Sequence, residues 1–153
     1  MSTVTVWRIA TAVRETELFS GNGGLYVSGR WHPVGVRMVY ASESRALAAL
    51  EIMVNVPERA QLNRHAWVIA AADIPSSLIS KPNRFPLDWR SIPSGDATRA
   101  LGKAWLKSAE SPALRVPSAV ILGEFNYLLN PLHPDFAKIK LHPPQPFAFD
   151  ARF

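Results

Sequence analysis

Short runs of apolar and β-branched residues recur along the chain, separated by glycine, proline and serine. Such runs are typical of short, buried β-strands. They predict strands at residues 4–10, 37–41, 66–72 and 118–122. Residues 123–130 are also apolar, but their pattern fits a strand or a helix. Two further strand-like pieces lie in a proline-rich tail, at residues 138–141 and 147–149.

Two segments carry helix signals. Ser42 is a good N-cap and predicts a helix that runs to about Val56, where Pro57 ends it. Asp96 is placed to cap a second helix over residues 97–109. The elements together predict an α+β fold, a single compact domain of short mixed strands with a few helices.

We expect one domain over residues 1–153, because a chain of this length buries enough surface for one core. Residues 75–95 are rich in proline and serine and predict an excursion over the surface. No repeat of 20–50 residues is visible, which argues against a repeat architecture.

Composition excludes several classes of protein. Hydrophobic residues make up 48% of the chain and charged residues 19%, the opposite of the balance that keeps a chain disordered. No apolar stretch is long enough to predict a membrane span, and we expect no secretion signal at the N-terminus. Cysteine is absent, which excludes disulfides, thiolate metal sites and cysteine catalysis.

The charge balance favours an acidic partner. Lys and Arg number 17 against 12 Asp and Glu, a formal net charge of +5. Nucleic acid, a phosphorylated metabolite or an acidic protein would each suit this excess. The basic residues are spread along the chain without a block of like charges, so nucleic-acid binding is not the favoured interpretation.

Residues 19–35 hold five of the eight glycines. Glycine-rich loops allow backbone N–H groups to approach a phosphate, and Gly24 to Arg30 has the spacing of a P-loop. Arg30 replaces the P-loop lysine, and Trp31 replaces the hydroxyl residue that would bind Mg²⁺. We therefore reject a P-loop. A glycine-rich turn and a loop that approaches an anion both stay open.

Two arginines stand in unusual surroundings. Arg8 lies within an apolar strand, where arginine usually has a carboxylate or phosphate partner. Arg30 stands at the end of the glycine cluster beside an aromatic residue. Each residue taken alone fits a structural role or an anion-binding role.

Residues 46–54 read ALAALEIMV and are apolar around the whole helix, which predicts a buried helix. Glu51 is the one charge in it, and burying an unpaired carboxylate is costly. Two interpretations stay open. Glu51 is a member of a structural ion pair with an arginine, or it is a carboxylate at the floor of a cleft.

Ser118 stands at the start of the predicted strand 118–122. Its hydroxyl could bind a ligand or satisfy backbone groups, and no nucleophile-elbow motif surrounds it. The histidines show no metal-ligand spacing, so we expect no metal site. They are His32, His65, His133 and His142.

These weak signals occur together in one order that resembles the RES-domain toxins, which are named for Arg, Glu and Ser. The matching stretches are WRIA, SGRWHPVG, MVYASES followed by ALAALE, LGKAWL, RVPSAV, EFNYLLNPLHPD and FAFDARF. The resemblance covers essentially the whole chain. Family members commonly read GGRWN where this chain has Ser28 and His32 around Gly29-Arg30-Trp31.

The resemblance implies a fold similar to ADP-ribosyltransferases and an enzyme that degrades cellular NAD by hydrolysis or phosphorolysis. Carried over by position, Arg30, Glu51 and Ser118 are the three family residues, and Arg8 and Tyr40 match further pocket positions. Glu51, Arg30, Ser118 and Tyr40 are then expected to be catalytic. Arg8, Arg30, Tyr40 and Ser118 are expected to bind NAD. NAD is the substrate, and no cofactor or metal is expected.

The resemblance also implies a cytoplasmic toxin, whose activity arrests growth, and an Xre-like DNA-binding antitoxin that blocks its active site. A homodimer within that complex is expected, without direct nucleic-acid binding by this chain. Three alternatives stay open. They are an ADP-ribosyltransferase that modifies a protein, an RNA-targeting toxin and a non-catalytic interaction domain.

Overall fold

A mixed β-sheet forms the centre of the protein in the computed structural model, which describes residues 2–12 and 14–153. Within these residues eight strands form one sheet in the order β4-β5-β6-β2-β1-β3-β7, and β8 also pairs with β3. The strands are β1 (Thr3–Thr11), β2 (Val39–Ser42), β3 (Trp67–Pro75), β4 (Ile79–Ser80), β5 (Ala113–Pro117), β6 (Phe125–Leu129), β7 (Lys140–Leu141) and β8 (Gln145–Phe147). Neighbouring strands are antiparallel except β4 and β5, which are parallel.

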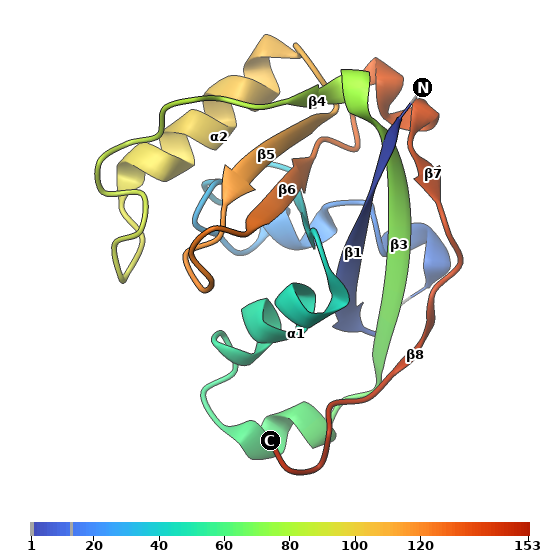
Figure 1. Cartoon of the computed structure of the whole chain (residues 1–153). Coiled ribbons are helices and arrows are strands. Elements are labelled where there is room, and N and C mark those ends of the chain that lie inside the picture. The colour runs from blue at the N-terminus through green and yellow to red at the C-terminus, as the bar shows by residue number, and fades with distance from the viewer. Residues whose placement is uncertain (1, 13) are drawn as a thin grey trace.

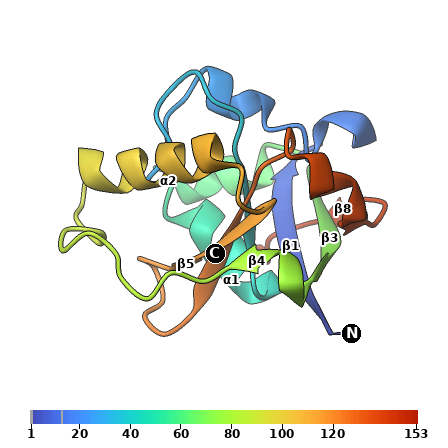
Figure 2. The ribbon, with the colours of Figure 1, turned by 90° about the horizontal axis from the view of Figure 1, so that it is seen from above.

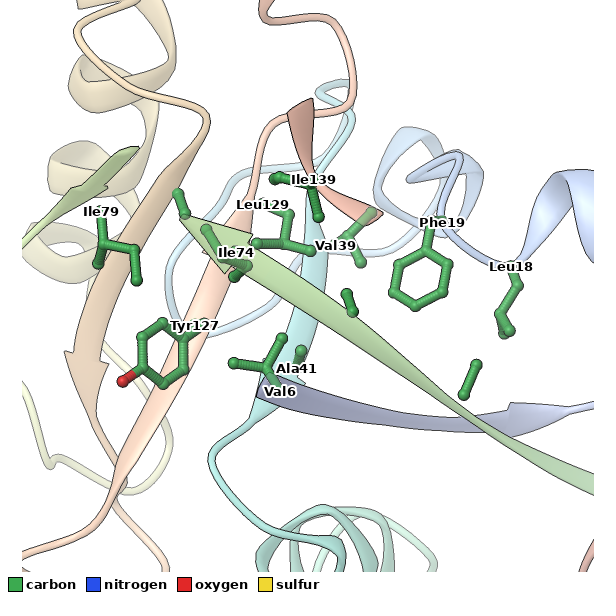
Figure 3. Close-up of a cluster of buried hydrophobic side chains, with 13 residues drawn as sticks. Val6, Leu18, Phe19, Val39, Ala41, Ile74, Ile79, Tyr127, Leu129 and Ile139 are labelled. Atoms are coloured by element: carbon green, nitrogen blue, oxygen red, sulfur yellow. The ribbon is translucent and has the colours of Figure 1, made fainter. Parts of the chain in front are cut away.

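The longest pairing joins β1 to β3, from Thr3 opposite Pro75 to Thr11 opposite Trp67. One face of these strands carries apolar side chains that pack with residues of β2 and β6. Figure 3 shows this cluster, in which Val6, Val39, Ile74 and Leu129 are all fully buried. The alternation of apolar residues along each strand supplies this face, because successive side chains point to opposite sides.

Two α-helices cover parts of the sheet. The first, α1 (Arg45–Met53), packs against β1 and β2, and the second, α2 (Asp96–Ser108), lies beside β5 (Figure 1). Trp105 of α2 is buried with Trp31, which belongs to the segment between β1 and β2. In Figure 2 that segment, blue to cyan, runs alongside α2. Gly102 permits this approach, because a Cβ there would stand 1.7 Å from the Trp31 carbonyl oxygen.

The first helix is shorter and less buried than expected. It begins after Ser44, whose side chain accepts a hydrogen bond from Leu47 N–H, whereas Ser42 continues β2 opposite Asn126. Ala46 and Val54 are exposed, so the prediction that residues 46–54 are buried on all sides was wrong. The second helix agrees with the prediction within one residue at each end.

The predicted strand at residues 118–122 was wrong. The strand is β5, which ends at Pro117, and residues 119–122 form bends and a turn. The Ser118 hydroxyl accepts hydrogen bonds from Val120 N–H and Ile121 N–H, both at 3.1 Å, and this bonding closes the turn. The apolar segment 123–130, which fitted either element, contains strand β6.

The remaining elements complete an α+β fold, as predicted. Residues 75–95 include β4 before the chain crosses the surface to α2 (Figure 1). The tail contributes β7 and β8 to the edge of β3, and β8 begins two residues earlier than expected. None of the helices within the described residues is long and apolar enough to span a membrane.

Candidate active site

A cavity of about 810 Å³ opens between β1, β2 and α1 on one side and the glycine-rich segment on the other. Its volume lies within the usual range for small-molecule sites, roughly 300–1,000 Å³. Arg8, Arg30, Tyr40 and Glu51 all line it, although the sequence separates them by up to 43 positions. The structure therefore brings four of the five predicted site residues to one cavity.

Glu51 projects from α1 into this cavity and is held by one of its two carboxylate oxygens. The Ser118 hydroxyl donates to Oε2 at 3.2 Å, and the side-chain amide of Asn126 donates to the same oxygen. Within the described residues, Oε1 has no hydrogen-bond partner and Glu51 has no ion pair with an arginine. The ion-pair interpretation of Glu51 is therefore wrong, and the residue lines the cleft.

Asn126 is a site residue that the sequence reasoning missed. It lies on β6 opposite Ser42, and the Ser42 hydroxyl donates to its side-chain oxygen at 2.7 Å. That bond fixes which end of the amide faces Glu51, so its N–H groups point to the carboxylate. A polar residue inside the apolar run 123–130 was the signal that could have found it.

Ser118 does not line the cavity, and its side chain is fully buried. Its hydroxyl donates to Glu51 and accepts from two backbone N–H groups, which uses its one donor and both acceptor positions. These bonds leave the Ser118 hydroxyl no donor or acceptor position for NAD, so the structure does not favour the predicted direct contact. The hydroxyl contacts the Glu51 carboxylate instead.

Arg8 extends from β1 and bonds to backbone instead of a carboxylate. Its Nε donates to the Leu18 carbonyl at 2.8 Å, and an Nη donates to the Tyr40 carbonyl at 3.1 Å. Burial lowers the pKa of Arg8 to about 10, which leaves it charged at neutral pH. Two carbonyl bonds use two of the five guanidinium N–H groups, so donors are left for an anion in the cavity.

Arg30 is also bound to backbone carbonyls. One terminal nitrogen donates to the carbonyl oxygens of Trp89 and Ser91, at 2.8 and 2.9 Å. These bonds fix the side chain against the loop that precedes α2. The Nε and the other terminal nitrogen have no partner within the described residues, and they form the edge that matches a phosphate in a two-pronged way.

Tyr40 is bonded to the glycine-rich segment. Its hydroxyl oxygen lies 3.1 Å from Trp31 N and 2.7 Å from Nδ1 of His32. Burial raises the pKa of Tyr40, so the phenol is protonated at neutral pH. Gly29 is required for this contact, because a Cβ there would stand 2.5 Å from the hydroxyl oxygen. The glycine-rich segment thus includes a close approach of backbone to the Tyr40 and His32 side chains.

The cavity therefore presents two guanidinium groups and one carboxylate. No carboxylate lies within ion-pair distance of Arg8 or Arg30 in the described residues. Two unneutralised arginines in a half-buried cleft favour a ligand with negative charge. In the same residues no group of three or more His, Asp or Glu side chains is arranged to hold a metal ion.

The fold and this site define a single-domain α+β protein with a cleft that is lined by two arginines and one oriented carboxylate. The model of the RES domain family matches residues 5–150. The chain belongs to the RES-domain family of toxins.

Two curated relatives match nearly the whole chain. A protein of Sphingobium sp. (strain YBL2), named Prs ADP-ribosylating toxin, is 37% identical over 98% of this chain and 96% of its own length. A protein of Yersinia enterocolitica, named Toxin Res, is 31% identical over 96% of this chain and 97% of its own length.

A solved structure has the same fold. It is the crystal structure of the M. tuberculosis MbcT-MbcA toxin-antitoxin complex, with a TM-score of 0.75. The match covers 96% of this chain and 85% of that chain, at 16% sequence identity. The mixed α+β architecture is therefore shared between distant sequences.

Proposed function

We propose that this protein is an enzyme that breaks the nicotinamide–ribose bond of NAD and thereby depletes the cell of NAD. The observation that carries the proposal is a pairing in the cavity lining. Glu51, whose Oε1 has no hydrogen-bond partner in the described residues, lines the same cavity as two arginines that no described carboxylate neutralises. NAD matches both parts of this arrangement. Its pyrophosphate suits the two arginines, and its ribose, which becomes positively charged during the reaction, suits the carboxylate.

Arg8 and Arg30 are proposed to hold the pyrophosphate. Both line the cavity, and both are fixed by carbonyl bonds before any ligand arrives. Fixed donors lose little freedom on binding, so more of each charge-assisted hydrogen bond, about 1.5–3 kcal/mol, contributes to affinity. The carbonyl oxygens of Trp89 and Ser91 hold the Arg30 side chain in place.

Glu51 is proposed to act at the ribose. Oε1 accepts a hydrogen bond from a ribose hydroxyl, and its charge faces C1′ as the bond to the nicotinamide nitrogen breaks. The electron pair leaves with the nitrogen, which becomes neutral, and C1′ acquires oxocarbenium character. Water or phosphate then adds to C1′ and releases a proton to solvent. A preoriented carboxylate stabilises this transition state more than the ground state.

The test is NAD consumption by the purified protein after EDTA treatment. We expect wild-type protein to release nicotinamide and the Glu51→Gln variant to lose most of that activity. Glu58→Gln is the matched control, because Glu58 is exposed and lies outside the cavity. Intact NAD together with cleaved RNA would overturn the proposal in favour of an RNA-targeting toxin.

Transfer of ADP-ribose to a protein is the second candidate function. The Sphingobium relative is named as an ADP-ribosylating toxin, and Val27, Val54 and Ile92 are both exposed and part of the cavity lining. Exposed apolar residues at a cavity mouth suit a macromolecular acceptor. Adenylate-labelled NAD in a cell extract separates the two candidates. Label in protein supports transfer, and label in small molecules supports NAD degradation.

We also propose an antitoxin partner, an Xre-like DNA-binding protein that covers the cavity mouth. The structural neighbour comes from a toxin-antitoxin complex, which supports a partner of this kind. A homodimer within the complex, a cytoplasmic location and one domain over residues 1–153 are part of the same proposal. Light scattering of the coexpressed pair tests the partner and the stoichiometry.

A further inference from the structure

His32 is a buried polar residue in the glycine-rich segment, at 4% exposure, and the proposed reaction does not use it directly. Both ring nitrogens are bonded. Nε2 lies 2.9 Å from the Val27 carbonyl oxygen, and Nδ1 lies 2.7 Å from the Tyr40 hydroxyl oxygen. The ring therefore bridges the exposed end of this segment to β2.

The two partners determine where the ring proton lies. A carbonyl oxygen only accepts, so Nε2 must carry the proton that it donates to Val27. In a neutral imidazole Nδ1 is then the acceptor, and the Tyr40 hydroxyl must donate to it. Burial lowers the pKa of His32, which favours this neutral form at pH 7.

The Tyr40 hydroxyl has a second fixed contact, because it accepts the Trp31 N–H at 3.1 Å. Its single proton is committed to His32 and one of its two acceptor positions to Trp31. Within this network the hydroxyl keeps only an acceptor position and its ring for a ligand.

We propose that His32, which lines the cavity beside Tyr40, is a positioning residue that engages the Tyr40 hydroxyl proton in a hydrogen bond to Nδ1, so that Tyr40 meets the substrate as a ring and an acceptor and never as a donor. The effect extends to Arg30, because Gly29 N–H bonds the His32 carbonyl at 3.1 Å and closes the turn that carries Arg30. The hydrogen bonds among His32, Tyr40 and Trp31 do not depend on which substrate binds. The effect on substrate binding rests on the proposed function.

The first test reads the imidazole itself and needs no NAD. Nitrogen-15 NMR distinguishes the two neutral tautomers, and the His32 signals are assigned by their loss in His32→Gln. His65→Gln is the matched control, because His65 is exposed and lies outside the cavity. We expect a neutral ring at pH 7 with the proton on Nε2. A proton on Nδ1, or a charged ring at that pH, would overturn the proposal.

Two substitutions separate the two bonds of the ring. The amide nitrogen of Gln lies near the position of Nε2, so His32→Gln keeps the donor to Val27 and loses the acceptor for Tyr40. The amide of Asn lies near the position of Nδ1, so His32→Asn keeps the acceptor for Tyr40.

A double-mutant cycle of His32→Gln and Tyr40→Phe, measured by urea unfolding, gives the coupling energy between the two side chains. We expect each single change to raise the unfolding equilibrium constant up to about tenfold and the double change to add little. Additive effects would contradict the bond.

The final test measures NAD turnover in the same variants. We expect KM to rise several-fold in His32→Gln, with a smaller rise in His32→Asn. In the Tyr40→Phe background, His32→Gln should have no further effect on KM. An independent effect in that background would show that His32 does not act through Tyr40. If no variant consumes NAD, wild type included, the proposed function fails while the NMR and unfolding results still decide the role of His32.

Discussion

Replacing Glu51 with glutamine separates the catalytic charge from the structural hydrogen bonds. Ser118 and Asn126 both donate to Oε2, so the glutamine oxygen can take that position and accept from both. Its amide nitrogen then takes the position of Oε1, which has no hydrogen-bond partner in the described residues. No buried donor loses its partner, and we expect the free energy of unfolding to stay within about 1 kcal/mol of wild type.

Glu51→Ala provides the comparison. It leaves the donors of Ser118 and Asn126 without a partner, and each orphaned group costs about 1–3 kcal/mol. The half-buried position of Glu51 lets water compensate in part, so we expect a total loss of about 2–4 kcal/mol. Urea unfolding followed by circular dichroism measures both variants against wild type.

Activity should not follow stability, because we expect both variants to lose it to a similar extent. Both variants remove the negative charge that faces C1′, and loss of such an electrostatic group costs on the order of 10²–10³ in rate. The Glu51→Gln variant should therefore be folded, stable and nearly inactive in nicotinamide release. A variant with near-normal turnover would refute the catalytic role. A loss of stability above about 3 kcal/mol would refute the arrangement of donors around Oε2.

Three further outcomes follow from the same contacts. Ser118→Ala should lower the free energy of unfolding by about 2–4 kcal/mol in urea, because it leaves two backbone N–H groups without an acceptor. It should also reduce kcat more than it raises KM. A change in KM alone would instead indicate that Ser118 contacts the substrate directly. Arg30→Lys should raise KM for NAD about tenfold, because lysine cannot keep two carbonyl bonds and also present a two-pronged edge, and wild-type kinetics would show that Arg30 does not contact substrate. Because burial lowers the folded-state pKa of His32 below 6.5, the unfolded chain takes up a proton first as pH falls. The free energy of unfolding should thus fall below about pH 6.5, and His32→Gln should flatten this part of the profile; an unchanged profile would show that His32 does not titrate in this way.

Local sequence patterns determined the elements whose apolar spacing matches the face that they bury. The strands near residues 4–10, 37–41 and 66–72 and the helix near 97–109 lie where they were expected. In these segments the apolar spacing and the flanking turn residues agree with the tertiary packing, so a short window of sequence is sufficient. The resemblance to the family likewise selected four residues that line the cavity.

Tertiary structure decided the elements in which local and distant hydrogen bonds compete. Ser42 is a good helix cap in isolation, yet its hydroxyl bonds Asn126, which lies 84 residues away, and the helix begins two residues later. Residues 118–122 have the composition of a strand, yet the Ser118 hydroxyl takes two of their backbone N–H groups and forms a turn.

The chemistry of the site also depended on contacts distant in sequence. The bonds that orient Glu51 join it to Ser118 and Asn126, across 67 and 75 residues. The sequence by itself specified a carboxylate in an apolar helix and could not specify which donors would reach it or which of its oxygens they would bind. Only the pairing of β2 with β6 and the turn after β5 bring those donors to Oε2, because hydrogen bonds form over about 3 Å and not along the chain.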